Sequence, residues 1–229
     1  STSRRQRQMC IRDRCLLIDT LYKSVYIGGY MITRKEMTRM LLKEGLLSCL
    51  ENHSFESVTV TLLCKASGIT RSTFYLHYSN IMEIVDDLVD DAIAYSKPGM
   101  VDNNNLQIIA NTLSVASNSV SLREAYDSIF DRLPLCQRII RHKKYLPLFL
   151  DEQISEYVLQ RIIRSEKDRQ GLVMAEVLGV SFDVGVSIFI FLVHGLYAVN
   201  KQYKWSQSDE WLEAQKIIFE LVYRGLQSK

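Results

Sequence analysis

Two short helical segments that meet at a turn around Gly68 restrict the fold more than any other feature of the sequence. Thr59 and Thr70 stand where a side-chain oxygen can cap the helices that follow them, predicted at 60–66 and 71–78. Gly68 readily adopts the left-handed backbone conformation in which many helices end. The stretch therefore predicts a helix-turn-helix, a pair of short helices joined by a tight turn.

The apolar residues of this stretch are spaced to fill a small core between the two helices. Leu63, Ile69 and Phe74 fall on the sides that face each other. Ala66 has a small side chain, so we expect the two helices to cross at this residue.

The second helix begins with polar side chains that can contact base pairs. In a helix-turn-helix bound to DNA, this end of the second helix enters the major groove. Arg71 can make two hydrogen bonds to guanine, and Thr73 can place its methyl group against thymine. Tyr75 and His77 are better placed for phosphates, because each joins an apolar body to a polar tip.

The stretch from Met31 to about Val85 resembles the DNA-binding domain of the tetracycline-repressor family. The matching pattern is Phe55, Val58-Thr59-Val60, Ala66-x-Gly68-Ile69, Thr73-Phe74-Tyr75-x-His77-Tyr78 and Asn80 at the start of the next helix. Beyond residue 100 the resemblance is limited to size and helicity.

The resemblance implies a homodimer that binds a palindromic operator in double-stranded DNA. Residue by residue, it places the following side chains at the DNA: Arg71, Ser72, Thr73 and Tyr75, with Thr59 and His77 at the phosphate backbone. Ile81 departs from the family, in which a Lys often meets phosphate at this position. We therefore expect Arg34, Lys35 and Lys65 to support DNA binding.

The rest of the chain also reads as helix, so the predicted fold class is all-α. Three Pro and ten Gly among 229 residues favour long helices. A helix-turn-helix domain of three helices is expected at 31–80, a connecting helix at 81–97, and a helical ligand-binding and dimerisation domain at 98–229. The individual helices are expected at 33–52 and near 106–117, 122–132, 146–165, 171–203 and 207–227.

Residues 1–30 have no clear helical period and hold six basic residues against two acidic ones. We interpret them as an extension that is disordered or not native to the protein. The alternative is a basic arm that touches the DNA backbone. Because the net charge of the chain is only +2, DNA affinity must come from a local patch.

Several classes of site find no support in the sequence. The five cysteines contain no Cys-x-x-Cys pair, which indicates a reducing cytoplasm and neither disulfides nor a metal site. No Gly-rich phosphate loop and no paired nucleophile and base point to an enzyme. We therefore expect no catalytic residue and no cofactor.

The run from Val184 to Asn200 lacks charged residues but falls short of the roughly 20 apolar residues that span a membrane. We interpret it as a buried interface helix in a homodimer formed through 171–203 and 207–227, with no membrane involved. A small-molecule effector is expected in the C-terminal domain. Aromatic side chains that could line its pocket are Tyr126, Phe130, Phe149, Phe182 and Phe189.

Two charged segments, one basic and one acidic, could each be a binding site or an ordinary charged surface. The basic cluster consists of Arg138, Arg141, His142, Lys143 and Lys144, and we interpret it as a solvated charge run rather than a site for an acidic ligand. The helix after Asn80 has an acidic face formed by Glu83, Asp86, Asp87, Asp90 and Asp91.

The leading hypothesis is a cytoplasmic transcription repressor that an effector releases from DNA by favouring another spacing of the two recognition helices. The alternative is a protein-binding module of the same fold with weak or no DNA binding. Ile81 and the acidic helix favour this alternative.

Overall fold

The computed structural model describes residues 26–27, 30–31, 33–96, 105–116, 118–133, 137–138 and 143–227. Over these ranges the protein is all-α, as predicted, apart from two strands of two residues each. The strands β1 (Tyr26–Ile27) and β2 (Tyr30–Met31) pair antiparallel. No sequence pattern predicts this hairpin, because two residues are too few to show alternation. The remainder of the predicted extension lies outside the described residues.

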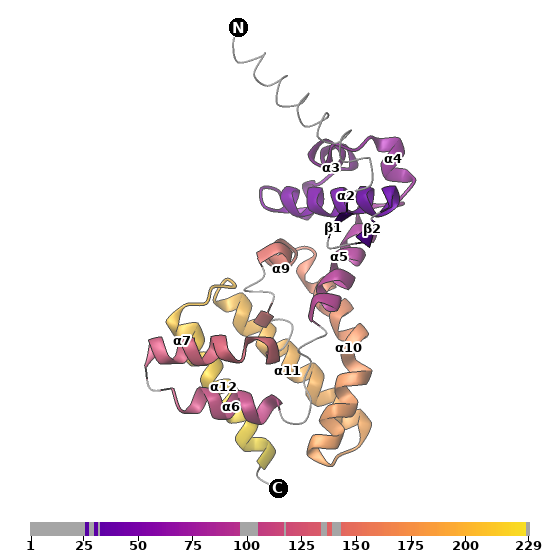
Figure 1. Ribbon diagram of the computed structural model, residues 1–229. Helices are drawn as coiled ribbons and strands as arrows, with labels where there is room; N and C mark the ends of the chain where they lie inside the picture. Colours follow the sequence, from indigo (N-terminus) through magenta and orange to yellow (C-terminus); the bar gives the residue numbers. More distant parts are fainter. Residues whose placement is uncertain are drawn as a thin grey trace.

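The N-terminal helices gather at one end of the molecule (Figure 1). They are α2 (Arg34–Leu50), the 3-10 helix η1 (Phe55–Ser57), α3 (Val60–Ser67) and α4 (Arg71–Tyr75). Helix α2 begins with a capping box, in which the Thr33 hydroxyl accepts from the Glu36 N–H and the Glu36 carboxylate accepts from the Thr33 N–H.

The turn between α3 and α4 has the predicted local chemistry. The Thr59 hydroxyl accepts from the Leu62 N–H at 3.2 Å, and the Thr70 hydroxyl accepts from the Thr73 N–H at 3.2 Å. Gly68 has φ 68° and ends α3 in the left-handed region. Both caps and the glycine turn are therefore confirmed.

Helix α4 is shorter than predicted. It ends at Tyr75, because the N–H groups of Leu76 and His77 donate to carbonyls three residues back, as in the tighter 3-10 form. Ala66, expected where α3 and α4 cross, is instead exposed. A close approach that the sequence analysis did not address occurs between α2 and α3, where a Cβ on Gly45 would lie 2.0 Å from the Ser67 Oγ.

Helix α5 (Ile81–Ser96) leads from the N-terminal helices into the C-terminal body (Figure 1). The helices of that body are α6 (Asn105–Ser114), α7 (Ser119–Ser128), η3 (Phe130–Arg132), η4 (Lys143–Tyr145), α9 (Leu146–Leu150), α10 (Ser155–Leu178), α11 (Phe182–Gln202) and α12 (Asp209–Gln227). Helices α10 and α11 form the most extensive helix pair, while α12 packs on α6 and α7. One continuous cluster of buried apolar side chains joins α2, α5 and the C-terminal helices.

Two predicted C-terminal helices were bounded wrongly. The helix predicted at 146–165 is interrupted by Asp151, whose side chain accepts from the N–H groups of Gln153 and Ile154 before α10 begins. The helix predicted at 171–203 is divided by Gly179, which has φ 62°. The apolar pattern continues across Gly179, so periodicity alone does not reveal the break.

Candidate nucleic-acid interface

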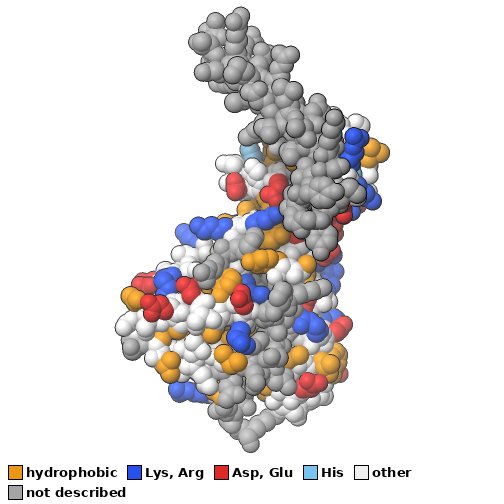
Figure 2. Space-filling model, viewed as in Figure 1, with side chains coloured by type: hydrophobic (Ala, Val, Ile, Leu, Met, Phe, Trp, Pro, Cys, Tyr) orange, Lys and Arg blue, Asp and Glu red, His pale blue; other side chains and the backbone are white. Residues whose placement is uncertain are grey.

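Helix α4 presents an exposed face at the end of the molecule away from the C-terminal body (Figure 1). Arg71 and Ser72 are exposed and Thr73 is half-buried. Tyr75 is 53 % exposed and Leu76 is 81 % exposed, so two large side chains lie next to each other at the surface. In the space-filling view, basic and apolar side chains lie together near this end (Figure 2).

Leu76 is a residue that the sequence analysis missed. An apolar residue between Tyr75 and His77 suggests a buried position in a helix that continues to 78. Because α4 ends at Tyr75, Leu76 instead projects into solvent. Its exposure becomes visible only once the end of the helix is known.

The start of α4 is held by the Thr70 hydroxyl. This oxygen lies 3.0 Å from the Ser72 Oγ and 2.8 Å from the Thr73 Oγ1, in addition to its bond from the Thr73 N–H. On the opposite side of the helix, Phe74 is completely buried, and its ring meets the Tyr75 ring edge-on at 5.0 Å. These contacts fix the orientation of the exposed face.

A cluster of Arg39, Tyr78 and Asp87 joins α2, the end of α4 and α5. The Tyr78 hydroxyl donates to Asp87 Oδ2 at 2.5 Å, and Arg39 Nε donates to the same oxygen at 3.0 Å. A second guanidinium nitrogen of Arg39 also bonds to this oxygen. The guanidinium carbon lies 5.1 Å from the centre of the Tyr78 ring, which is 3 % exposed.

The protonation states of this cluster follow from its contacts. Burial disfavours the charged form of Asp87, but hydrogen bonds from Arg39 and Tyr78 outweigh it and hold the Asp87 pKa below its usual value. The bond to Asp87 raises the pKa of Arg39, and burial raises that of Tyr78. At neutral pH the cluster is thus an ion pair with a neutral tyrosine bound to it.

Two predicted phosphate-contact residues, Lys35 of α2 and His77 just after α4, lie near each other. Burial lowers the pKa of His77, and the positive charges of Lys35 and Arg39 lower it further. His77 is therefore neutral at physiological pH and would act by hydrogen bonding rather than by charge. Lys35 is exposed in the first turn of α2. Thr59 is exposed at the start of α3.

The carboxylates on the acidic face of α5 bind other groups of the protein, although Asp90 remains exposed. Lys43 of α2 pairs with Asp91. Arg161 of α10 pairs with Asp90 at 2.9 Å and lies 3.3 Å from Asp86. The remaining contacts are the Tyr157 hydroxyl, which donates to Asp86 at 2.6 Å, and the Ser79 N–H, which donates to Glu83 at 2.8 Å. Ile81, the residue that departs from the family pattern, packs against the hydrophobic core.

Further polar contacts connect the N-terminal helices to the residues on either side of α9. The Phe55 N–H at the start of η1 donates to Asp151 Oδ2 at 2.7 Å. Lys144 pairs with Glu44 of α2 at 2.6 Å. Together with the pairs of Arg161, these contacts form a polar seam between the two parts of the chain. The seam therefore joins α10 to α5, and the residues that flank α9 to α2 and to the segment that precedes α3.

The aromatic side chains predicted to line an effector pocket lie in different places. Tyr126 and Phe149 are buried in the C-terminal core, and Phe130 is half-buried. Phe189 is buried on α11, whereas Phe182 at the start of α11 is 44 % exposed. Among the described residues, the structure brings no pair of these five rings into aromatic contact.

The basic cluster is not a uniform solvated run. Arg138 is only 4 % exposed, and burial lowers the pKa of its guanidinium. Lys144 is tied to Glu44, while Lys143 is exposed. The interpretation as a solvated charge run is therefore wrong for Arg138. The two other members, Arg141 and His142, lie outside the described residues.

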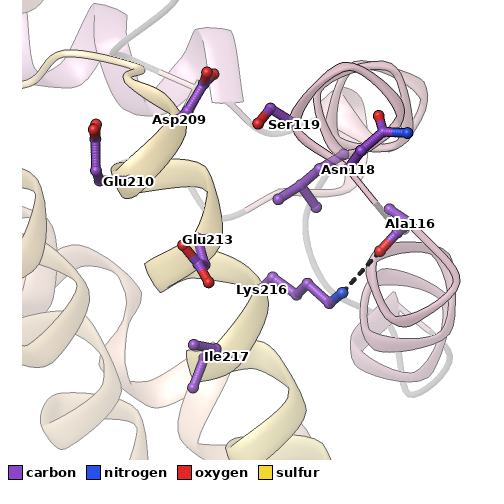
Figure 3. A pocket seen from close by; sticks show the side chains of 9 residues that line it. Ala116, Asn118, Ser119, Asp209, Glu210, Glu213, Lys216 and Ile217 are labelled. Carbon is purple, nitrogen blue, oxygen red and sulfur yellow. Dashed lines mark hydrogen bonds between the residues drawn. The ribbon is translucent and has the colours of Figure 1, made fainter.

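A cavity of about 440 Å³ opens between the start of α7 and the start of α12 (Figure 3). Lys216 reaches across it and donates to the Ala116 carbonyl at 2.8 Å. Its lining comprises Ala116, Asn118, Ser119, Leu122, Asp209, Glu210, Glu213, Lys216 and Ile217, so none of the five predicted aromatic residues contributes. Three exposed carboxylates make its mouth acidic.

Over the described part of the chain, no group of three His, Cys, Asp or Glu side chains could hold a metal ion. Cys49 and Cys64 are free thiols in the N-terminal core, and burial raises the pKa of both. Buried in this way, they act as small apolar residues.

Helix α11 has an exposed apolar face. Within the described residues it is the one helix long and apolar enough to cross a membrane, and 22 % of its most apolar window is buried. The core helix of a soluble protein meets the same criterion. On this helix Phe191 is 74 % exposed, and nothing lies within 4 Å of the position that a Cβ on Gly195 would occupy.

No family model matches the sequence, and a search of curated proteins finds no match. The candidate interface therefore rests on the residues and geometry described above.

The Arg39–Tyr78–Asp87 cluster leads to a stability prediction. Replacing Asp87 with Asn leaves Arg39 with a partly buried, neutral partner, so we expect a loss of about 1–3 kcal/mol in the free energy of unfolding at neutral pH. The Asp87 pKa is depressed in the folded state, so its contribution is present above the unfolded pKa near 4 and is lost as the pH falls further. The parent should therefore lose more stability than the variant upon acidification. Urea unfolding at neutral and acidic pH measures both effects.

Asp90→Asn is the matched control, because Asp90 lies on the same helix in an exposed ion pair. We expect it to change stability by no more than about 0.5 kcal/mol. Equal losses in the two variants would show that the Arg39–Tyr78–Asp87 cluster stabilises the fold no more than an exposed ion pair does.

Proposed function

We propose that this protein is a sequence-specific DNA-binding transcription regulator of the tetracycline-repressor type, which binds a palindromic operator as a homodimer and represses transcription. The observation that carries the proposal is the exposed face of α4, rigidly oriented at one end of the molecule. Arg71 and Ser72 offer hydrogen-bonding groups at the start of this helix, the part that enters the major groove in a helix-turn-helix.

The hydrogen bonds of α4 support distinct roles for its side chains. The Thr73 hydroxyl is occupied by Thr70, so its methyl group remains for contact with a thymine. Arg71 is free to extend toward a guanine, since it is exposed. Tyr75 and Leu76 add apolar surface at the end of the helix, where they would meet sugars or thymine methyl groups.

Phosphate contacts would come from groups around α4. Lys35 is exposed beside neutral His77, and Thr59 stands at the N-terminus of α3, where free N–H groups and the helix dipole favour an anion. The basic residues Arg39 and Lys43 are bound to α5 carboxylates, and we therefore assign them to positioning rather than to phosphate contact.

The alternative, a protein-binding module that uses the acidic helix, is less well supported. It required the carboxylates of α5 to be available to a partner. Instead, they bind side chains of α2 and α10 or cap their own helix. The acidity of α5 is thus explained by the internal structure, and no further partner is needed to account for it.

We propose that dimerisation occurs through α11 and α12. Exposed apolar side chains on these two helices are Phe182, Val184, Phe191, Ile217 and Leu221. A monomer would leave this surface in water, whereas a four-helix interface would bury it. The open space at Gly195, one turn from Phe191, can receive a bulky side chain from a second copy.

An effector in the C-terminal body would act through the polar seam. The ion pairs of Arg161 connect α10 to α5, and the bond from Phe55 to Asp151 connects η1 to the residue just before α10. A ligand that favours another position of α10 would change the spacing of the two α4 helices in the dimer. DNA and effector would then weaken each other's binding to the same extent.

Selection of duplexes from a random DNA pool by the full chain tests the proposal. We expect enrichment of a palindrome, because a symmetric dimer presents α4 twice. Arg71→Ala should relax the preference at one base pair of each half-site, costing about 1–3 kcal/mol there. Lys35→Ala is the matched control, since losing a phosphate contact should weaken all sequences alike and leave the enriched motif unchanged.

A folded dimer that enriches no sequence would contradict the proposal. If Arg71→Ala enriches the same sequences as the parent, the protein binds DNA but does not recognise base pairs through Arg71 of α4.

The dimer interface is tested by Phe191→Asp. A charge at the centre of a buried apolar interface is costly, so we expect the variant to be a folded monomer at concentrations where the parent is a dimer. Sedimentation equilibrium measures the mass. Val120→Asp, on α7, changes an equally exposed apolar residue outside this interface and should remain dimeric. If the Phe191→Asp variant remains a dimer, the dimer interface does not include this part of α11.

A further inference from the structure

Leu76 is the residue that directly follows α4, and its side chain is 81 % exposed. No large apolar side chain in the described part of the chain is more exposed. Contact between an apolar side chain and water is unfavourable, so a partner that covered Leu76 would gain affinity. Single apolar residues are nevertheless common at protein surfaces, so the setting of Leu76 decides whether it has a role.

The backbone at Leu76 is ordered by hydrogen bonds on both sides. The Leu76 N–H donates to the Thr73 carbonyl at 3.2 Å, and Leu76 itself keeps a helical conformation. Two residues later, the Tyr78 N–H donates to the Phe74 carbonyl at 3.0 Å. Phe74 is completely buried and Tyr78 is 3 % exposed. The position of Leu76 is therefore set by a backbone held between two buried aromatic residues.

Leu76 lies on the same face of the helix as the residues proposed to contact base pairs. Residues four apart in a helical backbone are neighbours on one face, so Leu76 lies one turn beyond Ser72. Tyr75 lies one turn beyond Arg71 in the same way. All four side chains are exposed, whereas Phe74 faces the core. A partner that contacts Arg71 and Ser72 through this face would also meet Leu76.

The charge around this face favours a polyanion as the partner. Helix α4 contains no acidic residue, and Arg71 is exposed at its start. Lys35 is exposed on α2 and lies close enough to His77, the residue after Leu76, to lower the pKa of that histidine. Basic groups beside an apolar side chain match the major groove of DNA. Phosphates border this groove, and thymine presents an apolar methyl group in it.

We propose that Leu76 is a specificity-determining residue that contacts the 5-methyl group of one thymine in each operator half-site. The proposal rests on the DNA-binding function proposed above and specifies the base that this part of the helix recognises. Leu76 follows Arg71 by five residues, a rise of about 7.5 Å along a helix, and base pairs are spaced about 3.4 Å apart. We therefore expect the thymine within about three base pairs of the pair that Arg71 contacts.

Replacing thymine with deoxyuridine tests the proposal, because it removes the methyl group and keeps every hydrogen-bonding group of the base. The selected operator is substituted at one thymine position at a time, in both half-sites, and the affinity of the full chain is measured by fluorescence anisotropy. At one position we expect a loss of about fourfold per half-site, or about fifteenfold for the palindrome, as for the burial of one methyl group.

Variants of Leu76 connect this loss to one side chain. Leu76→Ala should bind the thymine and deoxyuridine duplexes equally at that position, because the side chain that contacts the methyl group is shortened. Leu76→Met keeps an apolar side chain of similar volume and should keep most of the discrimination. Leu172→Ala makes the same truncation at an exposed leucine on α10 and should discriminate like the parent. Circular dichroism shows whether each variant is folded.

The outcomes separate this proposal from the function on which it rests. If the parent binds every deoxyuridine duplex as tightly as the operator, or if folded Leu76→Ala discriminates like the parent, Leu76 does not recognise a methyl group. The proposal is then overturned, although the selected operator still supports DNA binding. If no duplex is selected, both proposals fail. Binding to phosphatidylglycerol vesicles that Leu76→Ala weakens, in a protein that selects no duplex, would assign Leu76 to a membrane surface instead.

Discussion

The bond network of Arg39, Tyr78 and Asp87 is the constraint on which the candidate interface depends. It joins α2, the segment that follows α4, and α5 through one carboxylate, and so ties the chain just after the exposed face of α4 to its neighbours. The other acidic residues of α5 extend this arrangement, with Asp91 bound to α2 and Asp86 and Asp90 bound to Arg161 of α10. Helix α5 therefore connects the N-terminal helices to the C-terminal body through contacts on both of its sides.

Features set by local interactions could be predicted from the sequence. Thr59 and Thr70 cap the helices expected of them, and Gly68 ends α3 in the left-handed region. Such features depend on residues only a few positions apart, so the sequence displays both partners. The all-α class and the burial of Phe74 follow in the same way from composition and spacing.

Features set by distant residues could not be predicted. The sequence of α5 does not show that its acidic face is paired, because its partner Arg161 lies about 70 positions later in the chain. The crossing at Gly45 and Ser67 depends on the tilt of α2, which spacing within α3 does not reveal. The exposure of Leu76 likewise emerges only when its tertiary neighbours are known.

The central claim is that the face of α4 meets the phosphates and base edges of duplex DNA. The salt dependence of affinity for an operator-length duplex tests it most directly, because each neutralised phosphate contributes about −0.9 to the slope of log affinity against log salt. The account predicts tight binding at low salt and a steep loss with a slope of several such contributions. Undetectable binding at low salt, or an affinity that does not change with salt, would contradict it.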